Sequence, residues 1–66
     1  MYQDFRIRDF YYPGTGHWYH LEGQGRITGC WFTCFTSTRL GDVQDYCQEQ
    51  GWTMPDKVEL IRMEEL

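Results

Sequence analysis

Near Thr38 the spacing of apolar residues changes from the alternation typical of strands to the spacing typical of a helix. This change indicates the order of the secondary-structure elements. Before it, residues 4–12 alternate, with Phe5 and Ile7 on one side and Arg6 on the other, as in a half-buried strand. Residues 17–22 and 26–38 are rich in aromatic and β-branched side chains, and turn residues separate the three segments. These features predict three consecutive strands.

Beyond Thr38 the apolar residues recur at helical spacing. The face they form consists of Leu40, Val43, Tyr46, Cys47 and Gln50. Thr38, or Ser37 as a close alternative, is the expected N-cap of this helix, and Gly51 is placed to end it in the left-handed conformation. Trp52 is expected to fold back on the last turn. Residues 57–63 are then predicted to form a fourth strand, with a second short helix as the weaker alternative.

The predicted fold is therefore a single α+β domain over residues 1–66, in the order β-β-β-α-β. It has a three-stranded antiparallel meander, one helix packed on one face and a C-terminal fourth strand. A right-handed crossover would bring that strand back parallel, most simply beside the first. We expect a core in which the helix packs on the first and third strands; its members would be Leu40, Val43, Tyr46, Phe5, Ile7 and either Phe35 or Phe32.

Composition narrows the classes of function. The net charge of −4 and the pI of about 4.9 argue against a nucleic-acid partner, because such binders normally carry a basic patch. No apolar run approaches the roughly 18 residues of a membrane-spanning helix. The first ten residues are mixed and charged, unlike a signal peptide, which predicts a cytoplasmic protein with no membrane association and reduced thiols.

The stretch "GCWFTCF" (residues 29–35) raises the question of a metal site or a disulfide. On a strand, Cys30 and Cys34 would lie roughly 13 Å apart on one face, too far for a disulfide or shared zinc ligation. His17 and His20, offset by three, would lie on opposite faces. We therefore expect no metal and no cofactor, with Cys30, Cys34 and Cys47 as free, buried side chains. A histidine meeting a cysteine across the hairpin is the minority alternative.

No catalytic residues are assigned. The two histidines, several carboxylates and three thiols lack a recognisable nucleophile–base pattern, and a chain of 66 residues rarely encloses a cleft. The glycines of "PGTG" (residues 13–16) are interpreted as a turn, because no helix follows to supply the dipole of a phosphate loop. The sequence indicates a protein that is not an enzyme.

Two features indicate a binding surface. Asp42, Asp45 and Glu49 form a carboxylate row at i, i+3 and i+7 on the outer face of the helix, which is either a solvated face or a surface for a basic partner. On the longest strand, Thr28, Cys30, Phe32, Cys34 and Thr36 are predicted to point one way, and Ile27, Trp31, Thr33 and Phe35 the other. Because one helix covers one face only, aromatic residues should lie exposed on the other. The predicted partner-binding residues are Asp42, Asp45, Glu49, Trp18, Trp31 and Tyr12.

Taken together, these features predict an acidic protein–protein interaction module. Compact acidic domains without cofactors are common among phage-encoded inhibitors of host machinery, such as anti-CRISPR proteins, and the chain is similar to them in size, charge and layout. The expected partner is a larger protein with a basic or nucleic-acid-binding surface, which the module would block. A homodimeric structural or regulatory module is the alternative, and a small zinc-binding domain comes third.

Overall fold

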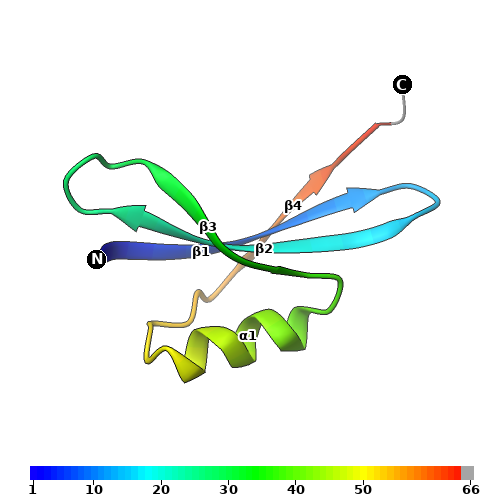
Figure 1. Cartoon of the computed structure of the whole chain (residues 1–66). Helices are drawn as coiled ribbons and strands as arrows, with labels where there is room; N and C mark the ends of the chain where they lie inside the picture. The colour runs from blue at the N-terminus through cyan, green and yellow to red at the C-terminus, as the bar shows by residue number, and fades with distance from the viewer. Residues whose placement is uncertain (65–66) are drawn as a thin grey trace.

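Four strands in one mixed sheet and one helix make up the fold, as predicted. The computed structural model describes residues 1–64. The elements are β1 (Tyr2–Tyr12), β2 (Gly16–Gly25), β3 (Trp31–Ser37), α1 (Leu40–Glu49) and β4 (Val58–Arg62). The strand order is β3-β2-β1-β4, with β4 parallel to β1 and the other two pairs antiparallel (Figure 1). The α+β order β-β-β-α-β and the return of the last strand beside the first are confirmed.

The β1–β2 hairpin is the longest pairing, and it sets the two faces of the sheet. Ile7 lies opposite Leu21, and both are buried under the helix, whereas Arg6 lies opposite Glu22 on the other face. The turn closes where the Thr15 backbone N–H donates to the Tyr12 carbonyl at 3.0 Å. Gly14 and Gly16 adopt φ of 86° and 118°, which residues with a side chain rarely adopt.

The third strand begins later than predicted. Residues 26–30 form a loop, because Gly29 adopts φ of 72° and its N–H donates to the Gly25 carbonyl at 3.0 Å. The Gly25 N–H in turn donates to the Cys30 carbonyl at 2.8 Å, which closes the connection. The expected strand over residues 26–38 is therefore wrong at its start, and Cys30 lies exposed in the loop.

A β-bulge also overturns the predicted alternation of this strand. Leu21 pairs with Phe35, but Glu22 pairs with Thr33, so Cys34 is an extra residue on β3. Cys34 and Phe35 both pack toward the helix, although strict alternation assigned them to opposite faces. One unpaired residue thus shifts every side chain on its N-terminal side to the other face.

The helix is confirmed at its C-terminus and corrected at its N-terminus. Gly51 has φ of 73°, and the N–H groups of Gly51 and Trp52 donate to the carbonyls of Gln48 and Cys47, the Schellman pattern. Neither Thr38 nor Ser37 is the N-cap; Arg39 holds that position without a side-chain hydrogen bond.

Ser37 is used differently from an N-cap. Its Oγ accepts from the Arg39 N–H at 3.1 Å and donates to Asp42 Oδ2 at 3.0 Å. The hydroxyl therefore orders the β3–α1 connection and ties the first turn of α1 to the end of the strand.

The core lies between α1 and the β1–β2–β3 part of the sheet. Its fully buried members are Ile7, Leu21, Val43 and Cys47. Phe35 stacks on Tyr46 with ring centroids 4.5 Å apart, and Trp52 folds back to stack on Phe5 at 4.7 Å. The predicted packing of Leu40, Val43 and Tyr46 with Ile7 is confirmed, with Phe35 rather than the exposed Phe32 contributing from the third strand. Phe5 was wrongly placed in this cluster, because it stacks on Trp52 beyond the helix, and α1 lies against β2 and β3.

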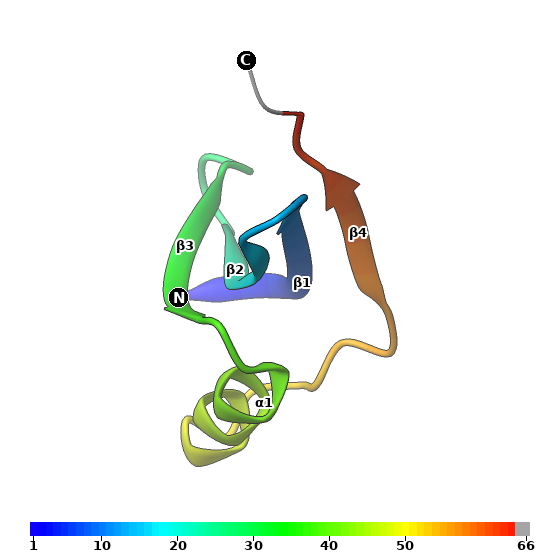
Figure 2. The same ribbon diagram turned by 90° about the vertical axis from the view of Figure 1, so that its right-hand side faces the viewer.

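Only one side of the sheet is covered by the helix. Viewed end-on, α1 lies below the sheet, and β3 and β4 rise on either side of the β1–β2 pair (Figure 2). The upper side carries no other element of the described chain (Figures 1 and 2). Side chains on that side are therefore free of contacts with the helix.

Candidate functional site

The uncovered side of the sheet presents a continuous set of aromatic and charged side chains. Arg6, Arg8 and Phe10 of β1 lie directly opposite Glu22, His20 and Trp18 of β2, so all six share this face. Trp31 of β3 and Tyr12 at the end of β1 extend it in opposite directions. We call this surface the open face; its members are Arg6, Arg8, Phe10, Tyr12, Trp18, His20, Glu22 and Trp31.

A buried carboxylate organises the centre of the open face. Glu22 is only 7% exposed, and its Oε1 accepts a hydrogen bond from Arg6 Nε and lies 3.8 Å from an Arg8 guanidinium nitrogen. The Arg6 guanidinium stacks over the Trp31 ring at 4.1 Å, and that of Arg8 lies 5.1 Å from the Phe10 ring centroid. One carboxylate oxygen therefore pairs with two arginines, each of which also lies against an aromatic ring.

One donor in this network is unused. Arg8 Nε makes no hydrogen bond with any described residue and approaches Glu59 Oε1 of β4 only at 3.5 Å. The Glu59 carboxylate therefore lies at ion-pair distance from this donor and links β4 to the centre of the open face.

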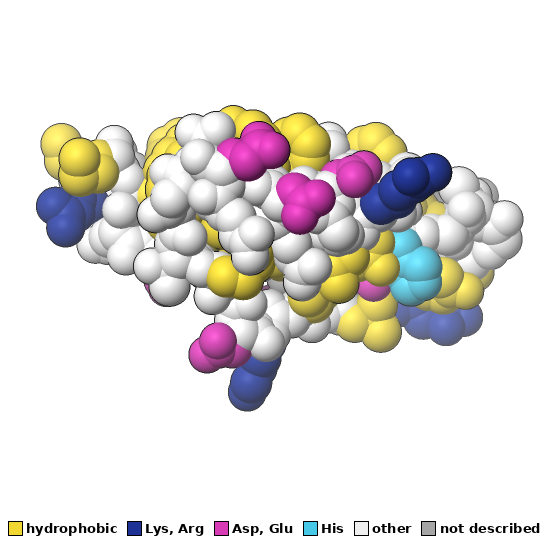
Figure 3. Space-filling model, turned by 90° about the horizontal axis from the view of Figure 1, so that it is seen from below, with side chains coloured by type: hydrophobic (Ala, Val, Ile, Leu, Met, Phe, Trp, Pro, Cys, Tyr) yellow, Lys and Arg dark blue, Asp and Glu magenta, His cyan; other side chains and the backbone are white. Residues whose placement is uncertain are grey.

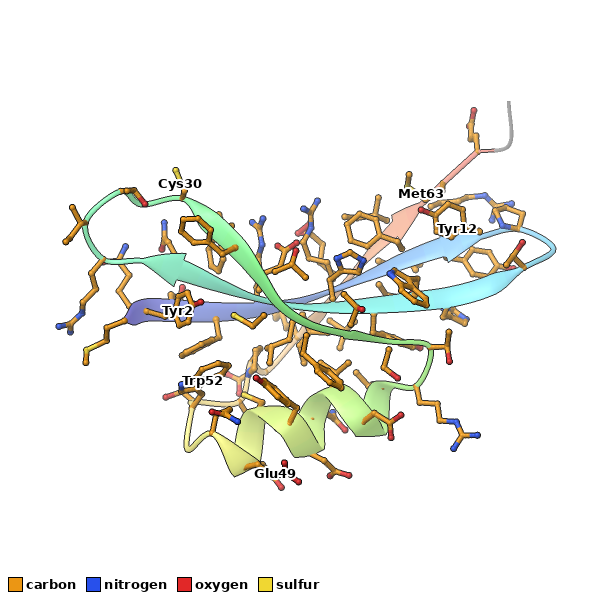
Figure 4. All side chains as sticks on the ribbon, viewed as in Figure 1. Tyr2, Tyr12, Cys30, Glu49, Trp52 and Met63 are labelled. Carbon is orange, nitrogen blue, oxygen red and sulfur yellow. The ribbon has the colours of Figure 1, made fainter. Side chains whose placement is uncertain are left out.

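Aromatic residues gather at the hairpin end of the open face. The rings of Phe10 and Trp18 lie 4.7 Å and 6.3 Å from the His20 ring. Beyond them Trp18 and Tyr12 are each 40% exposed. Tyr12 lies at the turn end of the hairpin, on the side of the sheet away from α1 (Figure 4).

A hollow of about 410 Å³ opens beside these two rings. We call it the hairpin hollow; its lining residues are Tyr12, Thr15, Gly16, His17, Trp18 and Thr38.

The helix side of the same hairpin holds a histidine–carboxylate pair that sequence reasoning missed. Asp9 is 6% exposed, and its Oδ2 lies 2.7 Å from His17 Nδ1, while its Oδ1 has no partner among the described residues. The His17 ring packs against Tyr11 and Tyr19. Burial, followed by the charge of Asp9, raises the pKa of the Tyr19 hydroxyl. The pair depends on the register of the hairpin, which places His17 diagonally across from Asp9. A prediction of that register would have been needed to find it.

Among the described residues, no nucleophile hydrogen-bonds to this histidine–carboxylate pair. A carboxylate that orients an imidazole also needs a nucleophile in contact with the other ring nitrogen. In residues 1–64 no hydroxyl, thiol or amine hydrogen-bonds to His17. His20 lies on the opposite face of the sheet, as its offset of three from His17 predicted.

The predicted partner-binding residues lie on two opposite surfaces. Asp42, Asp45 and Glu49 are all exposed on α1, where acidic side chains gather in a row (Figure 3). Trp18, Trp31 and Tyr12 lie on the open face, across the sheet from α1, with Trp31 half-buried under Arg6. The structure therefore divides the six residues into two separate groups.

The three cysteines have three different environments, and each carries a free thiol. Cys30 is exposed in the loop, Cys34 is half-buried at the bulge, and Cys47 is fully buried in the core. Burial, and secondarily the neighbouring Cys34, raises the pKa of the Cys47 thiol, which disfavours the reactive thiolate. The expectation that all three are buried is wrong for Cys30, because the loop removes it from the strand.

Comparison with known proteins adds no relative. No protein-family model, no curated protein and no solved structure matches this chain. Within residues 1–64, no helix has the length and apolarity needed to cross a membrane, and no three metal-ligating side chains cluster.

Proposed function

We propose that this protein is a non-enzymatic interaction module that contacts a larger protein through its open face. The observation that carries the proposal is an uncovered sheet face built from tryptophan, tyrosine and arginine, the residues that dominate protein interfaces. Trp18 and Tyr12 are each 40% exposed, and the guanidinium groups of Arg6 and Arg8 lie against the rings of Trp31 and Phe10. A solvated surface without a partner gives no reason for these features.

The acidic row supplies the second part of the proposal. Asp42, Asp45 and Glu49 carry three negative charges on α1, which contains no lysine or arginine. Such a surface attracts a basic partner over long range and speeds association without contributing most of the affinity. A partner with a basic, nucleic-acid-binding surface would be both attracted and blocked, and this is the action of a phage-type inhibitor.

Affinity capture with matched variants tests the proposal. The full chain is immobilised, and proteins retained from a lysate of the host cells are quantified by mass spectrometry. We expect at least one protein to be retained by the parent. The control variant Ile27→Ser should retain it too, because Ile27 is a loop residue that is 99% exposed and lies outside the open face. The same protein should be lost with Trp31→Ser and with Trp18→Ser, both checked for folding by circular dichroism. Equal retention by all four proteins would contradict a role for the open face.

The inhibitory action has its own readout. The captured partner's binding to nucleic acid is measured with and without an excess of the protein, and we expect it to fall. Unchanged nucleic-acid binding would contradict the inhibitory action but would be compatible with an interaction module.

A homodimer is the second candidate, and β4 is the observation that favours it. This edge strand exposes Val58 at 37% and Leu60 at 63%, and unpaired edge strands readily add a further strand. Light scattering measures the mass in solution. Twice the monomer mass for the parent and the monomer mass for Leu60→Lys would support the dimer instead of the inhibitor.

A further inference from the structure

Two of the three free thiols come together where α1 packs on β3. Cys47 is fully buried in the core, and Cys34 at the bulge packs against the same cluster of buried residues. Their neighbours in the chain, Tyr46 and Phe35, stack with ring centroids 4.5 Å apart and an interplanar angle of 8°. The helix and the strand are therefore held face to face beside the two cysteines.

The separation of the two elements is close to the one that a disulfide requires. Cα atoms of α1 and β3 approach within 8 Å, and a disulfide joins Cα atoms about 4.4–6.8 Å apart. Cys34 is the extra residue of the bulge, so the pairing with β2 does not fix its backbone. A small shift of this residue would bring the two sulfurs within bonding distance.

The electrostatics of Cys47 also place the two sulfurs near each other. Burial is the larger cause of the raised pKa of the Cys47 thiol, and the charge of Cys34 is the second. A thiol far from Cys34 would not respond to that charge. The two side chains therefore lie within electrostatic range across the helix–sheet contact.

Neither thiol has a strong partner in the reduced protein. Cys47 Sγ donates weakly to the carbonyls of Trp52 and Thr53, at 3.9 Å and 3.7 Å. Cys34 Sγ lies 3.7 Å from the Phe32 carbonyl. Oxidation of the pair would give up only these weak contacts.

We propose that Cys34 and Cys47 form a reversible disulfide that ties α1 to β3 when the protein meets an oxidant. The closed loop contains the end of β3, the following connection and most of α1, so the bond limits the separation of the helix from the sheet. The bond acts on the stability of the domain and does not depend on the open face or on its partner.

Exposure sets the order of the two chemical steps. Cys34 is half-buried, whereas Cys47 is fully buried and its raised pKa disfavours the thiolate, so Cys34 attacks first. The oxidant is a low-molecular-weight disulfide such as oxidised glutathione. The Cys34 thiolate bonds to one of its sulfurs and releases one glutathione. The Cys47 sulfur then bonds to Cys34 Sγ and expels the second glutathione, and the two protein thiol protons end on the two leaving groups.

The test uses the full chain with Cys30→Ser, because the exposed Cys30 would otherwise take up glutathione or link two chains. After incubation with oxidised glutathione, mass spectrometry should show the loss of two hydrogen atoms, and proteolysis should give a Cys34–Cys47 peptide pair that a reductant separates. The melting temperature of the oxidised form should rise by about 10 °C, because the bond restricts the unfolded chain. Circular dichroism during heating measures this rise.

Two further variants, each combined with Cys30→Ser, separate the roles of the thiols. Cys47→Val should stop at the first step and keep one glutathione on Cys34. Cys34→Ser should gain neither a glutathione nor stability, because the remaining thiol is buried. Both are checked for folding by circular dichroism, and if Cys47→Val does not fold, Cys34→Ser alone decides.

Three results would overturn the proposal. The first is that folded Cys30→Ser keeps both thiols under conditions that oxidise the denatured chain completely. The second is a stable glutathione adduct on Cys34 while Cys47 stays free. The third is a disulfide between two chains of Cys30→Ser in place of the bond within one chain.

Discussion

Glu22 is the charged residue on which the open face depends most. It is 7% exposed, and its Oε1 pairs with both Arg6 and Arg8, which lie two residues apart on the same face of β1. A carboxylate in this position both neutralises the arginines and fixes them against Trp31 and Phe10. The positions of both arginines therefore depend on one side chain.

Glu22→Gln tests this role at nearly constant volume. We expect a loss of about 1–3 kcal/mol in the free energy of unfolding, because two partly buried arginines lose their charged acceptor. Urea denaturation followed by tryptophan fluorescence measures it. The matched change Glu49→Gln, on the exposed face of α1, should alter stability by less than about 0.5 kcal/mol. Equal effects from the two substitutions would contradict the role given to Glu22.

The helix is the element that converts a sheet into a folded domain. Val43 and Cys47 are fully buried, and with Ile7 and Leu21 they make up the fully buried apolar core of residues 1–64. A core of so few side chains leaves little margin, since a domain of this size buries only about 60% of its unfolded surface.

Val43→Asp should therefore unfold most of the protein at room temperature. It places an unpaired carboxylate in the core at a cost of several kcal/mol, against a total stability of roughly 5–15 kcal/mol. Circular dichroism during heating measures the effect. Gln48→Asp, on the exposed side of the same helix, should cost less than about 1 kcal/mol. A melting temperature for Val43→Asp close to that of the parent would refute the packing of α1.

The sequence predicted elements well where a local signal exists. The period change near Thr38, the left-handed Gly51 and the return of Trp52 were each predicted from a few adjacent residues, and the structure has them. The bulge at Cys34 could not be predicted, because one unpaired residue leaves no trace in composition and depends on how two strands align.

The start of β3 could have been predicted better from the sequence. Gly29 is a turn residue inside a run of strand formers, and greater weight on it would have separated the loop from the strand. In the candidate site, the exposed Trp18 and Tyr12 and the acidic row were predicted. The Glu22 network and the Asp9–His17 pair were not, since both depend on the hairpin register.

At the scale of the whole molecule, charge and aromatic surface are separated. The acidic row lies on α1, and the open face lies across the sheet with two arginines and a carboxylate in balance. We therefore expect the acidic row to attract a partner at long range and the open face to hold it after contact. The two should affect different rate constants.

Reversing Asp45 and Glu49 to lysine should slow association with the captured partner about tenfold at low salt and weaken its salt dependence, with dissociation little changed. Asp42 is left intact because its bond to Ser37 supports the start of α1. Stopped-flow or biosensor kinetics at several salt concentrations measure the effect. Reversing Asp4 and Asp56, exposed residues outside α1, gives the same net charge. An equal slowing by that control would assign the effect to net charge and not to the row.

The pairing of β4 with β1 has a consequence for how the chain folds. The β1–β2 hairpin closes over a short turn, whereas β4 joins β1 only after the whole of β2, β3 and α1 has intervened. Closing that long loop costs entropy that the hairpin does not pay, so we expect β4 to dock last and to detach first. Detachment of β4 would leave the edge of β1 unpaired. The last hydrogen bond of this pairing runs from the Met63 N–H to the Tyr11 carbonyl at 2.8 Å. It helps to hold β4 in place, and β4 in turn covers the edge of β1 that could otherwise pair with a neighbouring chain.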